Sequence, residues 1–132
     1  MNSVEASPFS ANEISEWFWD IILRAARSKL KLRSILEGLT REEIYKFQDE
    51  FLDARTELTD ETFVIHIDPD ESENGTADIA DWVVSQGKEY FEEVLKDPRK
   101  IPYQVAMDNP EILFGVAEDV YEERFGETLD LM

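Results

Sequence analysis

Apolar residues recur near the start of the chain at the spacing of one helix face. They fall at offsets of +3, +4, +7, +8 and +11 from the first of them: Ile14, Trp17, Phe18, Ile21, Ile22 and Ala25. Ser10 and Glu13 spell a capping box just before this run, in which each side chain satisfies a free amide of a helix start. The pattern predicts an amphipathic helix that begins at Ser10 and ends near Arg27.

Two more helices are predicted in the first half of the chain. One spans residues 29–37 and ends at Gly38, a glycine suited to a left-handed helix stop. Thr40 and Glu43 spell a second capping box, which opens a long helix reaching about Leu58. The residues expected to face inward are Leu30, Ile35 and Leu36 in the first of these helices, and Ile44, Phe47, Phe51, Leu52 and Leu58 in the second.

Residues 62–67 are rich in β-branched side chains, which is typical of a strand. No second strand is evident, and a single strand has nothing to pair with. We therefore expect a buried segment that is extended or helical. Residues 68–75 contain Pro, Asp, Ser, Asn and Gly, which favour turns, so a loop is expected there.

Three helices are predicted in the second half, over residues 76–87, 88–97 and 109–125. The last follows an Asn-Pro pair that suits a helix start, and Gly126 closes it. Their inward residues are Ile79, Trp82 and Val83 in the first, Tyr90, Phe91, Val94 and Leu95 in the second, and Ile112, Val116, Val120 and Tyr121 in the third.

Together these elements predict an all-α fold, a single compact domain of about six helices in an irregular helical bundle. The chain has 132 residues, enough for one hydrophobic core without cross-links. Residues 1–10 are expected to form a flexible N-terminal arm, and residues 11–132 a single helical domain. No low-complexity tract separates two domains.

The three tryptophans test the predicted helix phases. Trp17 and Trp82 fall on apolar faces, so we expect both to be largely buried and to join the two halves of the chain. Trp19 lies off the stripe of the first helix. It is therefore either covered by a second packing surface or exposed.

Acidic residues outnumber basic ones by 31 to 13, which gives a net charge of −18. The excess is concentrated in the second half: 8 basic and 11 acidic residues occur up to Thr59, and 5 and 20 from Asp60 onward. Such a surface repels nucleic acid and anionic membranes and attracts a basic protein partner. The alternative is that the acidity only keeps the protein soluble.

One basic cluster interrupts this pattern, because no acidic residue occurs between Asp20 and Glu37. It consists of Arg24, Arg27, Lys29, Lys31 and Arg33. The net charge disfavours a phosphate site, so we interpret the cluster as an electrostatic contact within the chain or between subunits.

The chain lacks cysteine, which excludes disulfides and cysteine-bound metals. No apolar stretch is longer than three residues, whereas a membrane span needs about twenty. No secretory signal is evident near the start. We therefore expect a cytoplasmic location.

Candidate chemical sites are few. The stretch Asp68-x-Asp70-x-Ser72-x-Asn74 begins like a calcium-binding EF-hand loop. However, Glu73 stands where that loop needs glycine, and Ile79 where it needs a bidentate glutamate, so no metal site is predicted. His66 is the only histidine, and we expect it to be structural. The sequence predicts no catalytic residue and no cofactor.

Several segments resemble one bacterial family. They are the stretch EWFWDII at residues 16–22, LTREEI at 39–44, WVVSQGKEYF at 82–91, the pair Asp97-Pro98, and Ala117 with Tyr121 and Glu122. The chain resembles the family catalogued as domain of unknown function 4240, and the match covers most of its length. Residues 73–81 depart from the family pattern, which has a cysteine, two consecutive aspartates and an arginine there. The resemblance implies a helical fold and brings no activity with it.

These observations predict a non-enzymatic, acidic protein-binding module whose partner is a basic protein. An immunity protein that neutralises a toxin, or a mimic of nucleic acid, would be a specific form of it. The acidic surface expected to bind consists of Glu118, Asp119, Glu122 and Glu123. The alternative is a small enzyme or small-molecule binder with a pocket near His66 and Trp82.

Overall fold

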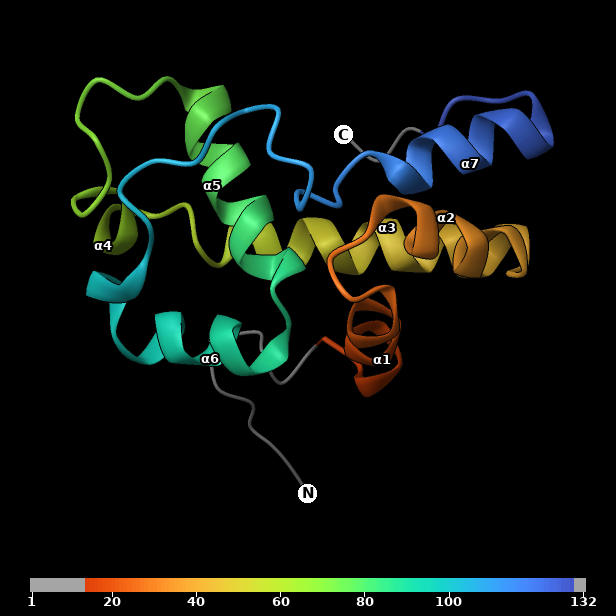
Figure 1. Ribbon diagram of the computed structural model, residues 1–132, viewed down its shortest axis with the longest axis horizontal. Coiled ribbons are helices and arrows are strands. Elements are labelled where there is room, and N and C mark those ends of the chain that lie inside the picture. Colours follow the sequence, from red (N-terminus) through yellow and green to blue (C-terminus); the bar gives the residue numbers. More distant parts are fainter. Residues whose placement is uncertain (1–13, 130–132) are drawn as a thin grey trace.

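The structure, a computed structural model, describes residues 14–129 (Figure 1). Within these residues it contains seven α-helices, one 3₁₀ turn and no strand. The elements are α1 (Glu16–Ala25), α2 (Lys29–Glu37), α3 (Arg41–Thr56), α4 (Glu61–Val64), α5 (Glu73–Ser85), α6 (Lys88–Lys96), the 3₁₀ turn Pro98–Lys100, and α7 (Val116–Phe125). The predicted all-α fold is confirmed. The expected N-terminal arm and the Ser10 to Glu13 capping box lie outside the described residues.

Helix α3 is the element around which the others are arranged (Figure 1). It packs against α1, α5 and α7, while α2 packs on both α1 and α7. Helices α5 and α6 pack against each other, and the 3₁₀ turn touches α4 and α6. Helices α1 and α6 are far apart in sequence but meet through the Trp19 and Phe91 rings, which lie 5.1 Å apart.

One connected cluster of buried side chains joins all these helices. Its centre is aromatic: the Phe18 ring lies 5.0 Å from that of Phe47 and 5.8 Å from that of Phe51. Phe51 in turn meets Phe114 at 5.4 Å, which connects the core to the second half of the chain. Aromatic pairs at these separations add to the stability that burial provides.

The start of α1 differs from the sequence prediction. The helix begins at Glu16, and its N-cap is Ser15, whose hydroxyl accepts a hydrogen bond from the Phe18 amide at 3.2 Å. Ser15 is fixed from a distant part of the chain, because its amide and hydroxyl donate to the buried Glu50 carboxylate at 2.6 and 3.1 Å. The described helix therefore begins at a cap that depends on α3, a partner that a local capping pattern does not reveal.

Helix α2 spans the predicted residues, but its phase and its stop differ. Leu30 is 79% exposed and Leu32 is buried in its place. Gly38 ends the helix with φ −91°, so it is not left-handed. The left-handed residues are instead Ala26 and Arg27, at φ 50° and 60°, which turn the chain sharply from α1 into α2. Two successive non-glycine residues in this region are uncommon.

Helix α3 follows the prediction closely. Both hydrogen bonds of its capping box form: the Glu43 amide donates to the Thr40 hydroxyl at 3.1 Å, and the Thr40 amide donates to the Glu43 carboxylate at 2.9 Å. Its predicted inward residues Ile44, Phe47 and Phe51 are buried, as is Leu58 beyond its end, while Leu52 is only partly buried.

Two helix starts in the second half of the chain differ from the prediction. The β-branched segment forms the single helical turn α4, and helix α5 starts at Glu73 because Ser72 caps it with a 3.0 Å bond from the Gly75 amide. Helix α7 starts at Val116, seven residues later than expected. Residues 109–113 form turns instead, because the buried Ser85 hydroxyl accepts the Leu113 amide and Gly115 takes φ 102°.

The tryptophans correct the predicted phase of α1. Trp19 is the buried one, at 4% exposure, and its ring lies 5.1 Å from that of Phe91 in α6. Trp17 and Trp82 are only partly buried. Trp17 lies beneath the Lys46 ammonium, and Trp82 meets the edge of Tyr90. Of the two alternatives for Trp19, the structure shows the covered one, and helix α6 is the surface that covers it.

Candidate functional site

A charged junction joins α3, α5 and the segment before α7. The Arg55 guanidinium donates two hydrogen bonds to the Asp81 carboxylate, at 2.8 and 2.9 Å, and Asp81 is buried. The guanidinium also lies 4.1 Å from the centre of the Phe114 ring. All of these contacts hold elements of the fold together, so the junction is structural.

Two further carboxyl groups lie near this junction. Burial raises the pKa of Asp81, and the hydrogen bonds from Arg55 oppose that rise. Burial also raises the pKa of Asp78 and of Glu118, and the positive charge of Arg55 lowers both in part. The charge of Arg55 therefore acts on three carboxyl groups, of which Asp81 is buried and Asp78 and Glu118 are partly exposed. Within residues 14–129, no group of three or more His, Asp or Glu side chains is placed to hold a metal ion.

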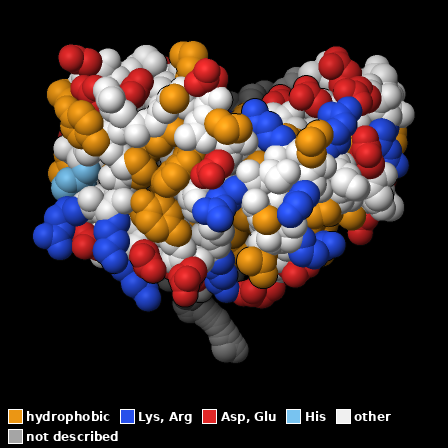
Figure 2. Space-filling view, in the orientation of Figure 1, with side chains coloured by type: hydrophobic (Ala, Val, Ile, Leu, Met, Phe, Trp, Pro, Cys, Tyr) orange, Lys and Arg blue, Asp and Glu red, His pale blue; other side chains and the backbone are white. Residues whose placement is uncertain are grey.

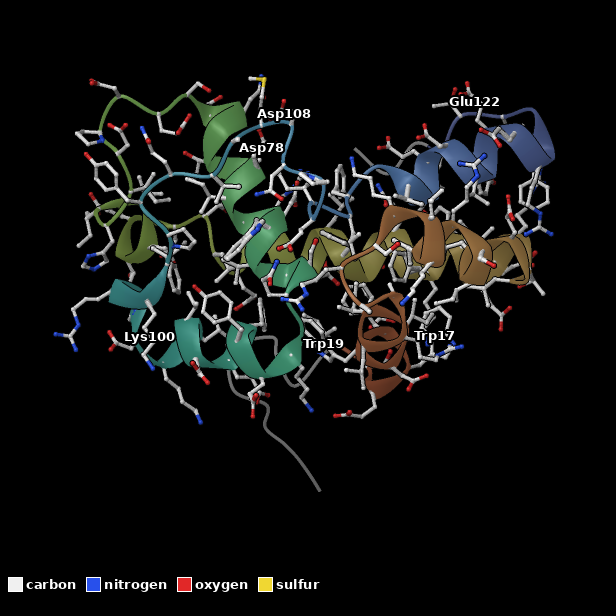
Figure 3. All side chains as sticks on the ribbon, viewed as in Figure 1. Trp17, Trp19, Asp78, Lys100, Asp108 and Glu122 are labelled. Atoms are coloured by element: carbon white, nitrogen blue, oxygen red, sulfur yellow. The ribbon has the colours of Figure 1, made fainter. Side chains whose placement is uncertain are left out.

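The predicted acidic surface lies along α7, where Glu122 points away from the rest of the molecule (Figure 3). Its four members do not play one role. Glu123 pairs with Arg33 of α2, and Glu118 is partly buried. Asp119 and Glu122 remain exposed. Beyond the helix, Glu127 pairs with Arg41 at 2.7 Å, so part of the acidity of this region fastens α7 to α2 and α3.

The two residues of the alternative pocket lie on different elements. His66 follows α4 and is partly buried, and Trp82 belongs to α5, against Tyr90. Whether a pocket joins them stays a prediction. In the calcium-like loop, Asp68 accepts a hydrogen bond from the Asp70 backbone amide at 3.0 Å and another, from outside the loop, from the Gln104 side chain.

A cleft lies where α1 approaches the start of α6. Its volume is about 640 Å³. The lining residues are Glu16, Trp19, Asp20, Leu23, Gln86, Gly87, Lys88, Glu89 and Glu92. We call this the α1–α6 cleft. Figure 3 shows Trp19 between the two helices, and Trp17 on the opposite side of α1. Neither His66 nor Trp82 lines it.

Four of the nine lining residues are carboxylates, and one is basic. Lys88 pairs with Glu16, which raises the pKa of the Lys88 ammonium, and Asp20 pairs with Arg24 at 3.0 Å. Within the described residues, no ion pair at bonding distance engages Glu89 or Glu92. The rim of the cleft therefore carries more negative than positive charge, and the charge of Glu92 also acts on the Lys88 ammonium.

The cleft owes its shape to Gly87 and Trp19. Gly87 takes φ 115°, a conformation that L-residues rarely adopt, and it turns the chain from α5 into α6. No atom lies within 4 Å of where a Cβ would stand on Gly87, so the space beside it is open. Trp19 closes the inner side, and Leu23, which is 75% exposed, offers apolar surface at the rim.

The sequence alone does not predict this cleft. Its two sides come from segments about seventy residues apart, as the Lys88 to Glu16 contact shows. The one available signal was the stretch Gln86-Gly87-Lys88-Glu89, part of the segment that most resembles a known family. Nothing in that stretch indicates which part of the chain it faces.

Among the described residues, no helix combines the length and the apolar character needed to cross a bilayer. The described residues form an all-α fold, and the chain carries a net charge of −18. The family model described as "Protein of unknown function (DUF4240)" matches residues 14–128, and the chain belongs to this family. Comparison with curated proteins and with solved structures found no significant match.

Proposed function

We propose that this domain binds a basic polypeptide, and that the α1–α6 cleft receives it. The observation that carries the proposal is a concave, negatively charged rim beside apolar surface. Lys and Arg side chains suit such a site, because their charged ends pair with carboxylates while their aliphatic parts cover apolar groups. Leu23 supplies that apolar surface, the largely buried Trp19 ring backs the cleft, and Glu89 and Glu92 supply the charge.

The cleft suits binding better than the face of α7 does. Concave sites with a few converging polar groups hold ligands more effectively than convex ones. On α7, Glu123 is already engaged by Arg33, and the exposed acids lie on the convex side of a helix. We assign the exposed acids of α7 to attraction of the partner over longer distances, which raises the rate of association.

The test is a comparison of three paired substitutions that each remove two negative charges. The first pair, Glu89→Gln with Glu92→Gln, alters the cleft. The second, Asp119→Asn with Glu122→Gln, alters α7. The third, Glu42→Gln with Asp49→Asn, is a matched control on the exposed side of α3, where Glu42 has the same position in the first helical turn as Glu89.

The probe is a fluorescent peptide of alternating lysine and leucine, and its glutamate–leucine counterpart serves as the negative peptide. Fluorescence anisotropy should show binding of the basic peptide alone. The cleft pair should weaken it about five- to tenfold, or roughly 1–1.4 kcal/mol, because each exposed ion pair contributes about 0.2–1 kcal/mol. The other two pairs should change the affinity less than about twofold. A larger loss for the α7 pair than for the cleft pair would contradict the assignment of the cleft.

A further inference from the structure

The turn between α1 and α2 carries an exposed surface of opposite charge to the rest of the molecule. We call it the α1–α2 corner, and it consists of Leu23, Arg24, Ala26, Arg27, Leu30 and Lys31. All six residues are exposed, and Leu23 and Leu30 are 75% and 79% accessible. Figure 2 shows blue basic side chains over α1 and α2 with orange apolar ones between them.

The charges of the corner are largely free. Arg24 pairs with Asp20, but no ion pair with a described residue engages Arg27 or Lys31. Ala26 and Arg27, which form this turn, both adopt the left-handed conformation that non-glycine residues rarely take. An exposed pair of leucines within a basic patch is a surface suited to an acidic partner with some apolar area.

The α1–α6 cleft has that complementary character and adjoins the corner. Leu23 belongs to both surfaces, and Arg27 follows it by four residues. One side of α1 therefore borders carboxylates, while its end is basic. Such a surface is self-complementary, because a twofold axis near Leu23 would bring the corner of each copy onto the cleft of the other. Interfaces of this kind are the commonest way in which identical chains pair.

We infer that a second copy of this chain binds through its α1–α2 corner to the α1–α6 cleft, and receives the corner of the first copy in return. The inference rests on the proposed function, since it names one basic occupant of the same cleft. The net charge of −18 on each copy opposes the pairing. At physiological ionic strength this repulsion is screened beyond about 8 Å, whereas the paired charges at the contact lie closer than that.

Two charge-reversed variants and their combination test the inference. The corner variant is Arg27→Glu with Lys31→Glu, and the cleft variant is Glu89→Lys with Glu92→Lys. Sedimentation equilibrium at physiological ionic strength should show reversible dimers of the wild type and an association at least about tenfold weaker for each variant alone. An equimolar mixture of the two variants should dimerise again, and so should one chain that carries all four substitutions.

Rescue in the mixture cannot arise from misfolding, because both contacts in the mixed pair again join opposite charges. A wild type that stays monomeric up to millimolar concentration would overturn the inference, as would dimers that both variants leave unchanged or a mixture that fails to pair. Binding of monomers to phosphatidylserine vesicles, lost in the corner variant, would overturn it by assigning the corner to a membrane surface.

The lysine–leucine peptide separates this inference from the proposed function. The corner variant retains every cleft carboxylate, so as a monomer it should bind the peptide at least as tightly as the wild type does. If the protein binds the peptide but no sample contains dimers, the proposed function would stand and the inference that a second copy occupies the cleft would be overturned. If the mixture of variants forms dimers but no sample binds the peptide, the pairing of two copies would stand and the proposed binding of a basic polypeptide would be removed.

Discussion

The Arg55–Asp81 junction and the α1–α6 cleft both contain carboxylates, but they use them differently. At the junction, the carboxylate is buried and accepts two hydrogen bonds from one guanidinium. At the cleft, Glu89 is exposed, Glu92 is partly buried, and both border open space. The carboxylates of the chain therefore occupy at least two different environments, and the count of acidic residues does not distinguish them. Burial and concavity do.

Helix α7 lies between these extremes. Glu123 and the nearby Glu127 fasten the helix through Arg33 and Arg41, while Asp119 and Glu122 remain exposed. Neighbouring carboxylates on one helix thus differ: some form ion pairs with other helices, and others are exposed to solvent. The effect of a substitution in α7 on stability should therefore be compared with that of a substitution at the junction, and its effect on peptide binding with that of a substitution in the cleft.

The largest difference between the two regions should appear in stability. Asp81→Ala leaves the Arg55 charge without its partner in a largely buried place, which typically costs about 3–5 kcal/mol. The cleft pair Glu89→Gln with Glu92→Gln should change the free energy of unfolding by no more than about 0.5 kcal/mol. Urea unfolding of the variants measures both values. A cost below about 1 kcal/mol for Asp81→Ala would contradict the structural role of the junction.

The inner wall of the cleft should behave like the core. Trp19→Ala removes a buried ring that packs on Phe91, so it should cost about 3–5 kcal/mol. Trp17→Ala and Trp82→Ala should each cost clearly less, because both rings are partly exposed. Thermal melts followed by circular dichroism give the order. A Trp19→Ala protein that melts within a degree or two of the wild type would mean that α1 and α6 do not pack as described.

Local signals in the sequence predicted most of the helices. The capping box at Thr40, the spacing of Ile44, Phe47 and Phe51, and the stop at Gly126 each depend on residues within a few positions of one another. Such patterns are visible without knowledge of the fold. The limits of α2 were likewise evident from its own residues.

The features that the sequence did not reveal depend on distant partners. The N-cap residue of α1, Ser15, is hydrogen-bonded to Glu50, 35 residues away in the sequence. The Leu113 amide donates to the Ser85 hydroxyl, 28 residues away, and Leu113 lies outside any helix. The predicted burial of Leu30 failed because the left-handed turn at Ala26 and Arg27 changes the direction in which α2 leaves α1. The cleft could not be predicted for the same reason, since its two walls meet only in the folded chain.

A smaller effect should appear in the pH dependence of stability. Burial raises the pKa of Asp78, Asp81 and Glu118, so the folded state holds their protons more tightly than the unfolded state does. Their contribution to stability is complete below the unfolded values, about 4, and is lost as the pH rises through the raised folded values. The melting temperature should therefore be higher near pH 5 than near pH 7.

Two single substitutions on α7 separate this effect from general repulsion between acids. Glu118→Gln should flatten the dependence of the melting temperature on pH, because it removes one group whose pKa is raised by burial. Glu122→Gln removes an exposed carboxylate of the same helix and should flatten it less. Equal slopes in the two variants would show that burial near the junction does not cause the effect.

The central claim is that the α1–α6 cleft, and not the face of α7, receives the basic segment of a partner. The most direct test is a titration of the isotope-labelled protein with the lysine–leucine peptide, followed by amide nuclear magnetic resonance. We predict saturable shifts of the Leu23, Gly87 and Lys88 amides, with little change at Asp119 and Glu122. Shifts concentrated on α7, with the amides of the cleft unmoved, would contradict it.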